Sequence, residues 1–181
     1  MNRRVKMDLF EACEKRYSYR GAYQDKPVPQ EDLERIVSAG LAAPSGCNAQ
    51  TTTFVIVSDP GLLVEMRKIH SMKAVQDAKA IIACVTAKKP VPVYEDQNFE
   101  AEDCAAAIEN MLLAISALGY ASVWIQGHLS KEGRAEKINA LLGIPAERTV
   151  RVILPVGVPA GEGERRPKKP FGARAWFNRH G

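Results

Sequence analysis

The sequence EDCAAAIENMLLAISAL at residues 102–118 is the longest amphipathic stretch of the chain. Its apolar side chains recur at helical spacing and predict one buried helix face made of Ala105, Ile108, Met111, Leu112, Ile115 and Leu118. Gly119 follows as a helix-ending signal. The run AIIACVTA at residues 80–87 is apolar throughout and of strand length, which predicts a central strand buried on both faces.

Further helices and strands are predicted on both sides of these two elements. Helices are expected at residues 8–15, 30–43, 60–71 and 130–142, the last with Ser130 as its N-cap. Strands are expected at residues 51–57, 120–126 and 148–158, and residues 88–99 are an irregular excursion. Because helices and strands alternate without a linker or repeat, we expect a single domain over residues 1–181, either α+β or α/β, with residues 159–181 as an extended tail.

Composition limits the possible functions of the chain. With 181 residues, 46% hydrophobic and 25% charged, the chain is expected to be globular with a sizeable core. A net charge of +4 suits anionic small ligands and does not require a nucleic-acid partner. The four cysteines are scattered, and the basic start at residues 1–10 contains no signal-peptide pattern. No segment approaches the length of a membrane span, so we expect a cytoplasmic protein with free thiols.

The usual catalytic motifs are absent from the sequence. No glycine-rich dinucleotide or phosphate loop and no GxSxG nucleophile turn occurs. The three histidines are scattered, so no metal site is expected. Ser45 and Cys47 have no base placed beside them by the sequence. An organic cofactor that carries its own chemistry would explain an enzyme of this kind.

Two polar clusters are candidates for such a cofactor site. The first, Arg16-Tyr17-Ser18-Tyr19-Arg20, alternates guanidinium groups with hydroxyls, and arginine matches the geometry of phosphate. The second, APSGCNAQ at residues 43–50, is a turn that carries two amides. Amides donate and accept hydrogen bonds at once, which suits the edge of a heterocycle.

In this order, the two clusters resemble the front-end motifs of the nitroreductase family. The helix at 103–114, its continuation LGYASVWI at 118–125, the strand VILPVGVP at 152–159 and the basic segment RRPKKPF at 165–171 are also similar to that family. The resemblance covers residues 8–171. It implies an α+β fold with a central, mainly antiparallel sheet flanked by helices, and an intertwined homodimer with two FMN sites formed by both chains.

The resemblance also implies roles for individual residues. Arg16 and Ser18 would contact the FMN phosphate and ribityl chain, and Arg20 would lie near the flavin pyrimidine edge as electrostatic support. Ser45 and Asn48 would reach the flavin from the partner chain. The remaining cofactor-binding residues would be Pro44 on the ring and Arg166 and Lys168 at the phosphate. No side chain is expected to act as a catalytic residue.

The sequence departs from the family at two points. Thr51-Thr52-Thr53 follows Gln50 where the family often has Pro-Trp, which affects the expected pocket shape. Lys168 stands where an arginine is common, so phosphate would meet a point charge without bidentate geometry.

The implied activity is an FMN-dependent oxidoreductase that moves electrons from NADH or NADPH through flavin N5 to a small organic acceptor. The acceptor could be a nitroaromatic, a quinone or a flavin, in a ping-pong scheme. Alternatives with the same fold are reductive dehalogenation and substrate dehydrogenation, for which residues 88–103 would be decisive. A non-catalytic flavin-binding module also remains open. Nucleic-acid binding through the basic tail has no support in the core, and no membrane partner is expected.

Overall fold

The sheet at the centre of the molecule has three antiparallel strands. A computed structural model describes residues 7–181, so residues 1–6 of the basic start lie outside the described residues. The strands are β1 (Thr53–Val57), β2 (Ala80–Ala87) and β3 (Arg148–Val156), in the order β1-β2-β3. The apolar run at 80–87 is therefore the middle strand, and both the central position and the antiparallel sheet are confirmed.

Two helices cover one face of this sheet. They are α2 (Gln30–Leu41) and α5 (Glu100–Ala117), and they pack closely against each other. Their buried side chains form one apolar cluster with the residues of β2 that point to this face, Ile82 and Cys84. Because side chains alternate along a strand, the neighbours of these residues point to the other face.

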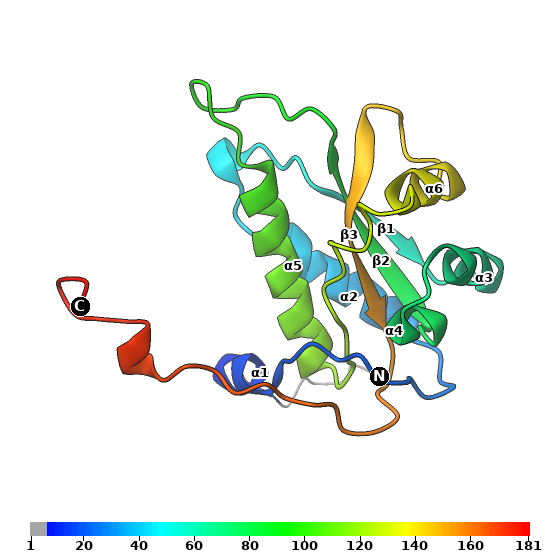
Figure 1. Ribbon diagram of the computed structural model, residues 1–181, viewed down its shortest axis with the longest axis horizontal. Coiled ribbons are helices and arrows are strands. Elements are labelled where there is room, and N and C mark those ends of the chain that lie inside the picture. The colour runs from blue at the N-terminus through cyan, green and yellow to red at the C-terminus, as the bar shows by residue number, and fades with distance from the viewer. Residues whose placement is uncertain (1–6) are drawn as a thin grey trace.

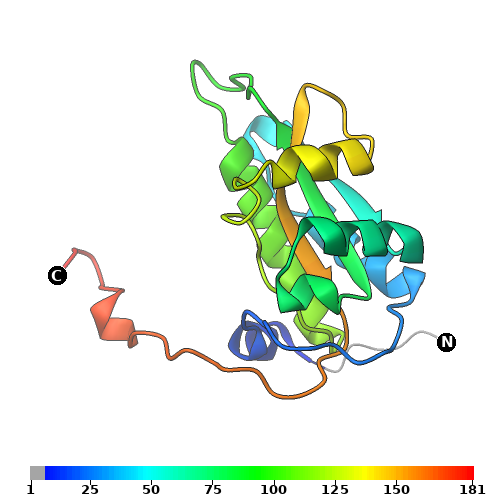
Figure 2. The same ribbon diagram turned by 45° about the vertical axis from the view of Figure 1, so that its right-hand side comes forward.

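Shorter helices cover the opposite face, as Figure 2 shows. They are α3 (Pro60–Ile69), α4 (Lys73–Gln76) and α6 (Arg134–Leu141). Ile81 and Ala83 of β2 join their apolar side chains in a second cluster. The molecule thus has three layers, and β2 is buried on both faces as its composition predicts.

Two predicted elements differ from the observed ones. The segment 120–126 is no continuous strand, since its residues make only isolated bridges, such as those of Ala121 with Gly157 and of Ile125 with Ile153. Helix α6 begins at Arg134 after Gly133, so Ser130 is not its N-cap. The hydroxyl of Ser130 instead donates to the carbonyl of Gly127 and closes a turn.

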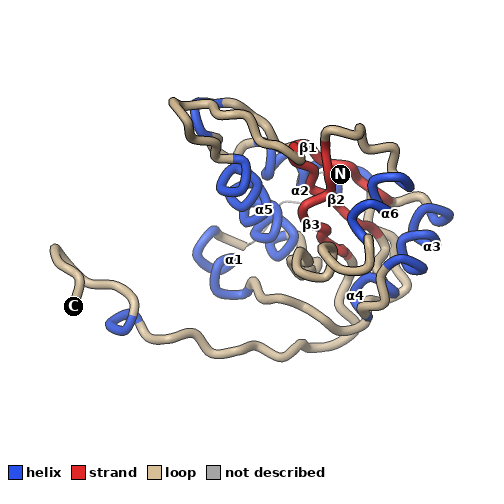
Figure 3. Tube along the Cα trace, turned by 45° about the horizontal axis from the view of Figure 1, so that its top comes forward, coloured by secondary structure: helices blue, strands red, loops and turns tan. Residues whose placement is uncertain are grey.

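The segments near the two ends of the chain run side by side. Helix α1 (Leu9–Lys15) begins at its cap Asp8 and is followed by a segment that pairs with residues 157–163. Gln24 N donates to Val158 O and Ala160 N donates to Ala22 O, at 2.8 and 2.9 Å. Beyond this pairing the tail leaves the body past α1 and contains the short helix η2 (Phe171–Ala173), as Figures 1 and 3 show.

None of the helices in the described residues is both long and apolar enough to cross a lipid bilayer.

Candidate functional site

A cationic groove lies where α1, the segment after it and the root of the tail meet. It has a volume of about 490 Å³. Five cationic side chains line it against two acidic ones, so its net charge is positive: Arg16, Arg20, Arg165, Arg166 and Lys168, with Glu14 and Glu164. Cys13, Tyr17 and Ser18 complete the lining. The structure therefore brings together all five residues that the sequence assigns to phosphate, ribityl chain and pyrimidine edge.

Pairing of the backbone places the first polar cluster at this groove. Tyr19 N donates to Ser122 O at 2.8 Å, and Ser18 forms a parallel bridge with Ser122, just beyond the end of α5. The ring of Tyr19 is buried in the core, with 2% of its surface exposed. Because Tyr19 points inward, its neighbours Ser18 and Arg20 are directed toward the surface. The alternation of this cluster therefore separates anchoring residues from ligand-facing residues.

Arg16 is held in place by a carboxylate of α5. Its Nε lies 3.1 Å from Oε1 of Glu109, and the side chain of Arg16 is 22% exposed. An arginine that uses Nε for an ion pair keeps both terminal nitrogens available as a fork. Arg20 is more exposed, and its Nη1 donates to the carbonyl of Ser18 at 3.3 Å.

The second polar cluster forms a tight turn at the other end of α5. Residues Gly46–Asn48 form the short helix η1, and Cys47, Asn48 and Gln50 have positive φ angles of 49°, 54° and 49°. The hydroxyl of Ser45 accepts a hydrogen bond from Gln50 N at 3.0 Å, which closes the turn. Sequence periodicity gave no sign of this geometry, because non-glycine residues rarely adopt positive φ.

Asp103, in the first helical turn of α5, holds the chain turn at residues 44–50 in place. Its Oδ1 accepts from Gly46 N at 2.8 Å, and its Oδ2 accepts from the hydroxyl of Thr51 at 3.4 Å. The carboxylate is nearly buried, with 7% of the residue exposed. Phe99 packs so tightly under Gly46 that a Cβ at this position would lie 2.2 Å from the ring. Pro44 and Asn48 remain exposed at the surface of the turn.

The turn and the cationic groove are separated on a single chain. Helix α5 has 18 residues, which corresponds to about 27 Å at ~1.5 Å per residue. The turn lies at its N-terminal end and α1 at its C-terminal end, as Figure 1 shows. The structure therefore does not bring Pro44, Ser45 and Asn48 to the groove that contains Arg16 and Lys168.

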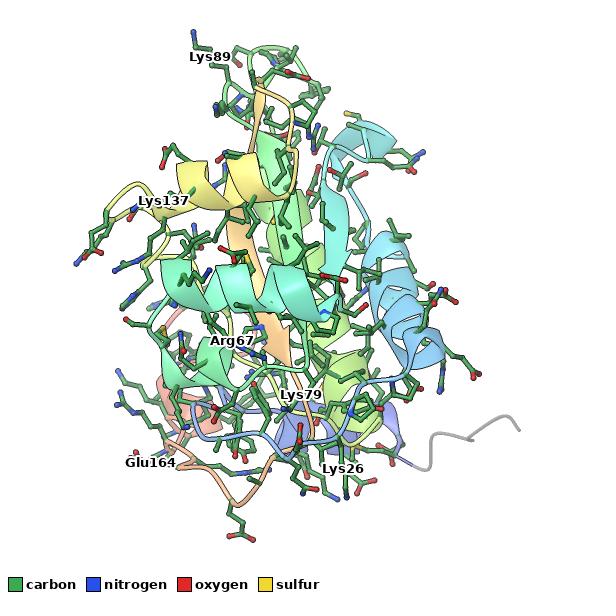
Figure 4. The ribbon with its side chains drawn as sticks, turned by 90° about the vertical axis from the view of Figure 1, so that its right-hand side faces the viewer. Lys26, Arg67, Lys79, Lys89, Lys137 and Glu164 are labelled. Carbon is green, nitrogen blue, oxygen red and sulfur yellow. The ribbon has the colours of Figure 1, made fainter. Side chains whose placement is uncertain are left out.

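The irregular segment 88–99 lies beside the turn rather than beside the groove. Phe99 at its end contacts Gly46, and Figure 4 shows Lys89 and Glu164 at opposite ends of the molecule. A second groove, of about 210 Å³, runs along the turn and is lined partly by Thr51, Thr52 and Thr53. The three threonines that replace the family's Pro-Trp thus make this surface more polar than the family pattern implies.

Two of the free thiols, Cys84 and Cys104, are buried, whereas Cys47 in the turn is exposed. Burial raises the pKa of the Cys104 thiol to about 11, and burial also raises the pKa of Cys84. Cysteine reacts as the thiolate, so these two side chains act as small core residues at neutral pH. Within residues 7–181, no group of three or more His, Cys, Asp or Glu side chains is arranged to hold a metal ion.

The sequence analysis did not identify the residues that hold the turn and the tail in place. Asp103 and Gly46 hold the turn, and Arg165 and Tyr17 join the tail to α1. Asp103 was visible only as an acidic residue in the first turn of a helix, where carboxylates are common. The separation of Arg165 from α1 along the chain left no local signal for their contact.

Comparison with known proteins finds one matching family model and several similar proteins. The model of the Nitroreductase family matches residues 13–80 and 67–158. A protein of Methanothermobacter thermautotrophicus, provisionally named NADH dehydrogenase/NAD(P)H nitroreductase, is 34% identical over 158 residues, covering 86% of this chain and 79% of its own length. An iodotyrosine deiodinase of Thermotoga neapolitana is 28% identical over 181 residues, covering 90% of this chain and 92% of its own.

A solved structure shares the fold over nearly the whole chain. It is an FMN-dependent nitroreductase from Clostridium difficile R20291, with a TM-score of 0.77 and 24% identity. The similarity covers 93% of this chain and 98% of that one.

Proposed function

This chain belongs to the nitroreductase family, and we propose that it is an FMN-dependent oxidoreductase that transfers electrons from NADH or NADPH to a small organic acceptor. In this proposal its 181 residues form one FMN-binding domain with an extended tail. The cationic groove carries the proposal. It combines an arginine fork with four further cationic side chains in a volume of about 490 Å³.

The residues at the groove fit a phosphate ester. The pairing of Arg16 Nε with Glu109 leaves two nitrogens for bidentate contact, and Arg166 and Lys168 add charge from the tail. The hydroxyl of Ser18 suits a neighbouring polyol chain because it both donates and accepts. Glu14 and Glu164 reduce the net charge of the groove without reversing it.

The turn at residues 44–50 suits contact with the flavin ring, but the turn would have to come from a second chain. Pro44 offers an exposed apolar surface, and Asn48 offers an exposed amide, on a turn that Asp103 holds rigidly. Because the turn and the groove of one chain are separated by α5, a complete site needs the turn of a partner. We therefore infer a homodimer, in which the exposed apolar residues Leu9 and Phe10 of α1 would be covered.

The protein's own contribution would be binding and electrostatics. When bound, FMN supplies the redox chemistry at its N5 atom in two half-reactions, reduction by NAD(P)H and oxidation by the acceptor. Arg20 would place positive charge where negative charge develops at the pyrimidine edge, which favours the reduced form. The turn and the segment 88–99 would shape the opening through which nicotinamide and acceptor enter in succession.

A second reaction on the same fold is reductive dehalogenation. The chain is similar to an iodotyrosine deiodinase over 90% of its length, which supports reductive dehalogenation as the alternative reaction. The four free cysteines suit a reducing cytoplasmic compartment under either reaction.

The test is the absorbance spectrum of the purified protein before and after anaerobic addition of NADH or NADPH. We expect one FMN per chain and bleaching of the flavin band by at least one of the two. Return of the colour on adding a nitroaromatic or a quinone, but not a halogenated tyrosine, would favour the first reaction. A colourless protein that does not bind added FMN would refute the proposal.

A further inference from the structure

We infer that Arg165 is a positioning residue that clamps the tail onto α1 and thereby holds Arg166 and Lys168 at the phosphate end of the groove. The inference rests on the proposed function, since it explains how this chain keeps an exposed, extended segment at the site. It concerns a residue that lines the groove but whose two terminal nitrogens donate to backbone carbonyls of α1.

The first half of the clamp is a cap on the end of α1. Nη1 of Arg165 donates to the carbonyl of Glu14 at 3.1 Å, and Nη2 donates to the carbonyl of Lys15 at 2.7 Å. The last carbonyls of a helix have no partner within the helix and carry partial negative charge. A guanidinium satisfies both of them at once, which an ammonium group cannot do with the same geometry.

The second half of the clamp is the ring of Tyr17. The guanidinium carbon of Arg165 lies 4.7 Å from the centre of this ring, in the geometry of a cation–π contact. The hydroxyl of Tyr17 accepts a hydrogen bond from Gly163 N at 3.1 Å. A Cβ at residue 163 would lie 2.5 Å from the ring, so only glycine allows this approach. Tyr17 therefore contacts the tail at both Gly163 and Arg165.

The clamp is anchored to the core through Tyr19. The rings of Tyr17 and Tyr19 meet edge to face with centroids 6.2 Å apart, and Tyr19 is buried. The tail root is thus joined to the core through a chain of contacts, although Arg165 itself is exposed. The end of the tail extends away from the body, as Figure 3 shows.

The clamp determines the local concentration of positive charge in the groove. Arg166 directly follows the clamped residue, and Pro167 restricts the backbone before Lys168. Both residues therefore stay in the lining of the groove while Arg165 is bound. With the clamp released, they would sample the much larger volume open to a free tail, and their effective concentration at a phosphate would fall.

Charge-conserving variants separate this role from simple electrostatics. Arg165→Lys keeps the net charge but loses the planar contact with two carbonyls and one ring. Arg174→Lys is the matched control, because Arg174 belongs to the same tail and does not line the groove. The dissociation constants of FMN and riboflavin are measured for each protein by flavin fluorescence, together with the melting temperature. Riboflavin lacks the phosphate, so it reports on ring binding alone.

We expect Arg165→Lys to weaken FMN binding by about 10-fold, as for the loss of one or two charge-assisted hydrogen bonds, and to leave riboflavin binding unchanged. Arg174→Lys should bind both flavins as the wild type does. Tyr17→Phe, which removes only the acceptor for Gly163 N, should show a smaller loss that is again confined to FMN. Wild-type FMN affinity in Arg165→Lys, or an equal loss for both flavins, would overturn the clamp. A wild-type protein that binds neither flavin would instead overturn the proposed function itself.

Discussion

At the residue scale, Arg16 and Arg20 are equal in charge and differ in how they are held. Arg16 is half-buried and paired with Glu109, whereas Arg20 is exposed and bonded only weakly to the carbonyl of Ser18. A pre-positioned guanidinium loses little freedom when it binds an anion, so it contributes more to affinity. The two arginines should therefore respond differently to substitution.

We predict that Arg16→Ala weakens FMN binding about 10- to 100-fold, since a charge-assisted contact is worth roughly 1.5–3 kcal/mol. Arg20→Ala should bind FMN within a few-fold of the wild type and mainly slow the reduction of the flavin by NAD(P)H. Flavin titration and stopped-flow absorbance measure the two effects. Equal FMN affinity in Arg16→Ala and the wild type would contradict the assignment.

His70 is a second residue whose position has a measurable effect. It is fully buried after α3, its Nδ1 accepts a hydrogen bond from Met72 N, and its Nε2 has no partner among the described residues. Burial lowers the pKa of His70 to about 4, and positive charge from His128 and Arg134 acts in the same direction. The ring is therefore neutral in the folded protein at pH values where an unfolded histidine takes up a proton.

We predict that the free energy of unfolding falls as pH drops from about 6.5 to 4, by roughly 1–3 kcal/mol from this residue. In that range the unfolded chain binds a proton that folded His70 does not, so acid favours unfolding. Above pH 6.5, His70 adds no pH dependence to the free energy of unfolding. Urea unfolding at pH 7.5 and 5 measures the slope. His70→Asn should reduce it, while His180→Gln, in the tail, should not.

At the element scale, the turn at 44–50 depends on the first turn of α5. We predict that Asp103→Ala lowers the free energy of unfolding by about 1–3 kcal/mol, because it leaves the half-buried Gly46 N–H without a partner. Glu102→Ala is the control, since Glu102 is exposed in the same helical turn. Urea unfolding of both variants decides the matter. Equal stability of the two would show that Asp103 does not hold the turn.

Elements with strong periodicity could be predicted from sequence, and elements fixed by distant contacts could not. The run at 80–87 is buried on both faces as its pattern predicts. The helix at 102–118 buries Ile108, Met111, Leu112 and Ile115 as predicted, but Ala105 and Leu118 are only partly buried, and Cys104 and Ala107 are buried instead. The segment 120–126 has strand-like residues, but its neighbours offer only isolated bridges. Ser130 has the right chemistry for a cap, yet Gly133 precedes the helix.

The candidate site could be predicted only in part, because some of its residues are held by contacts that are distant in the sequence. The arginines and the amide turn stand out as local motifs, and the structure gathers the first of them with Arg166 and Lys168 in one groove. The assigned contacts with FMN stay predictions. The residues that position the site, Arg165 and Asp103, act across 151 and 57 positions of sequence and leave no local pattern.

At the scale of the whole molecule, the tail has two parts with different surroundings. Its root at 158–165 is bonded to α1 and to the segment after it, whereas its end carries the exposed rings of Phe171 and Phe177. Exposed rings on an extended segment are expected to bind another surface, and in the proposed homodimer the partner chain would offer one. The root would then serve the cofactor and the end would serve the dimer.

We predict that deleting residues 170–181 raises the dimer dissociation constant at least several-fold. The affinity for FMN should stay nearly unchanged when the protein concentration exceeds this constant, so that the protein is still dimeric. Deleting residues 160–181 should reduce both, because it also removes Arg165, Arg166 and Lys168. Analytical ultracentrifugation and flavin titration measure the two properties separately. A 170–181 deletion with wild-type dimer strength would mean that the aromatic end is a free solvated terminus.

The contacts of residues 17–24 with residues 158–163 also determine when the proposed site can exist during synthesis. The ribosome makes the first arginine cluster long before its partners in the tail, which follow all three strands and the long helices in sequence. Domains acquire contacts of this range only after both segments are available. A chain that stops short of the tail lacks Arg165, Arg166 and Lys168, three of the five cationic side chains of the groove. Retention of the flavin would therefore distinguish chains that include the tail from chains that end before it.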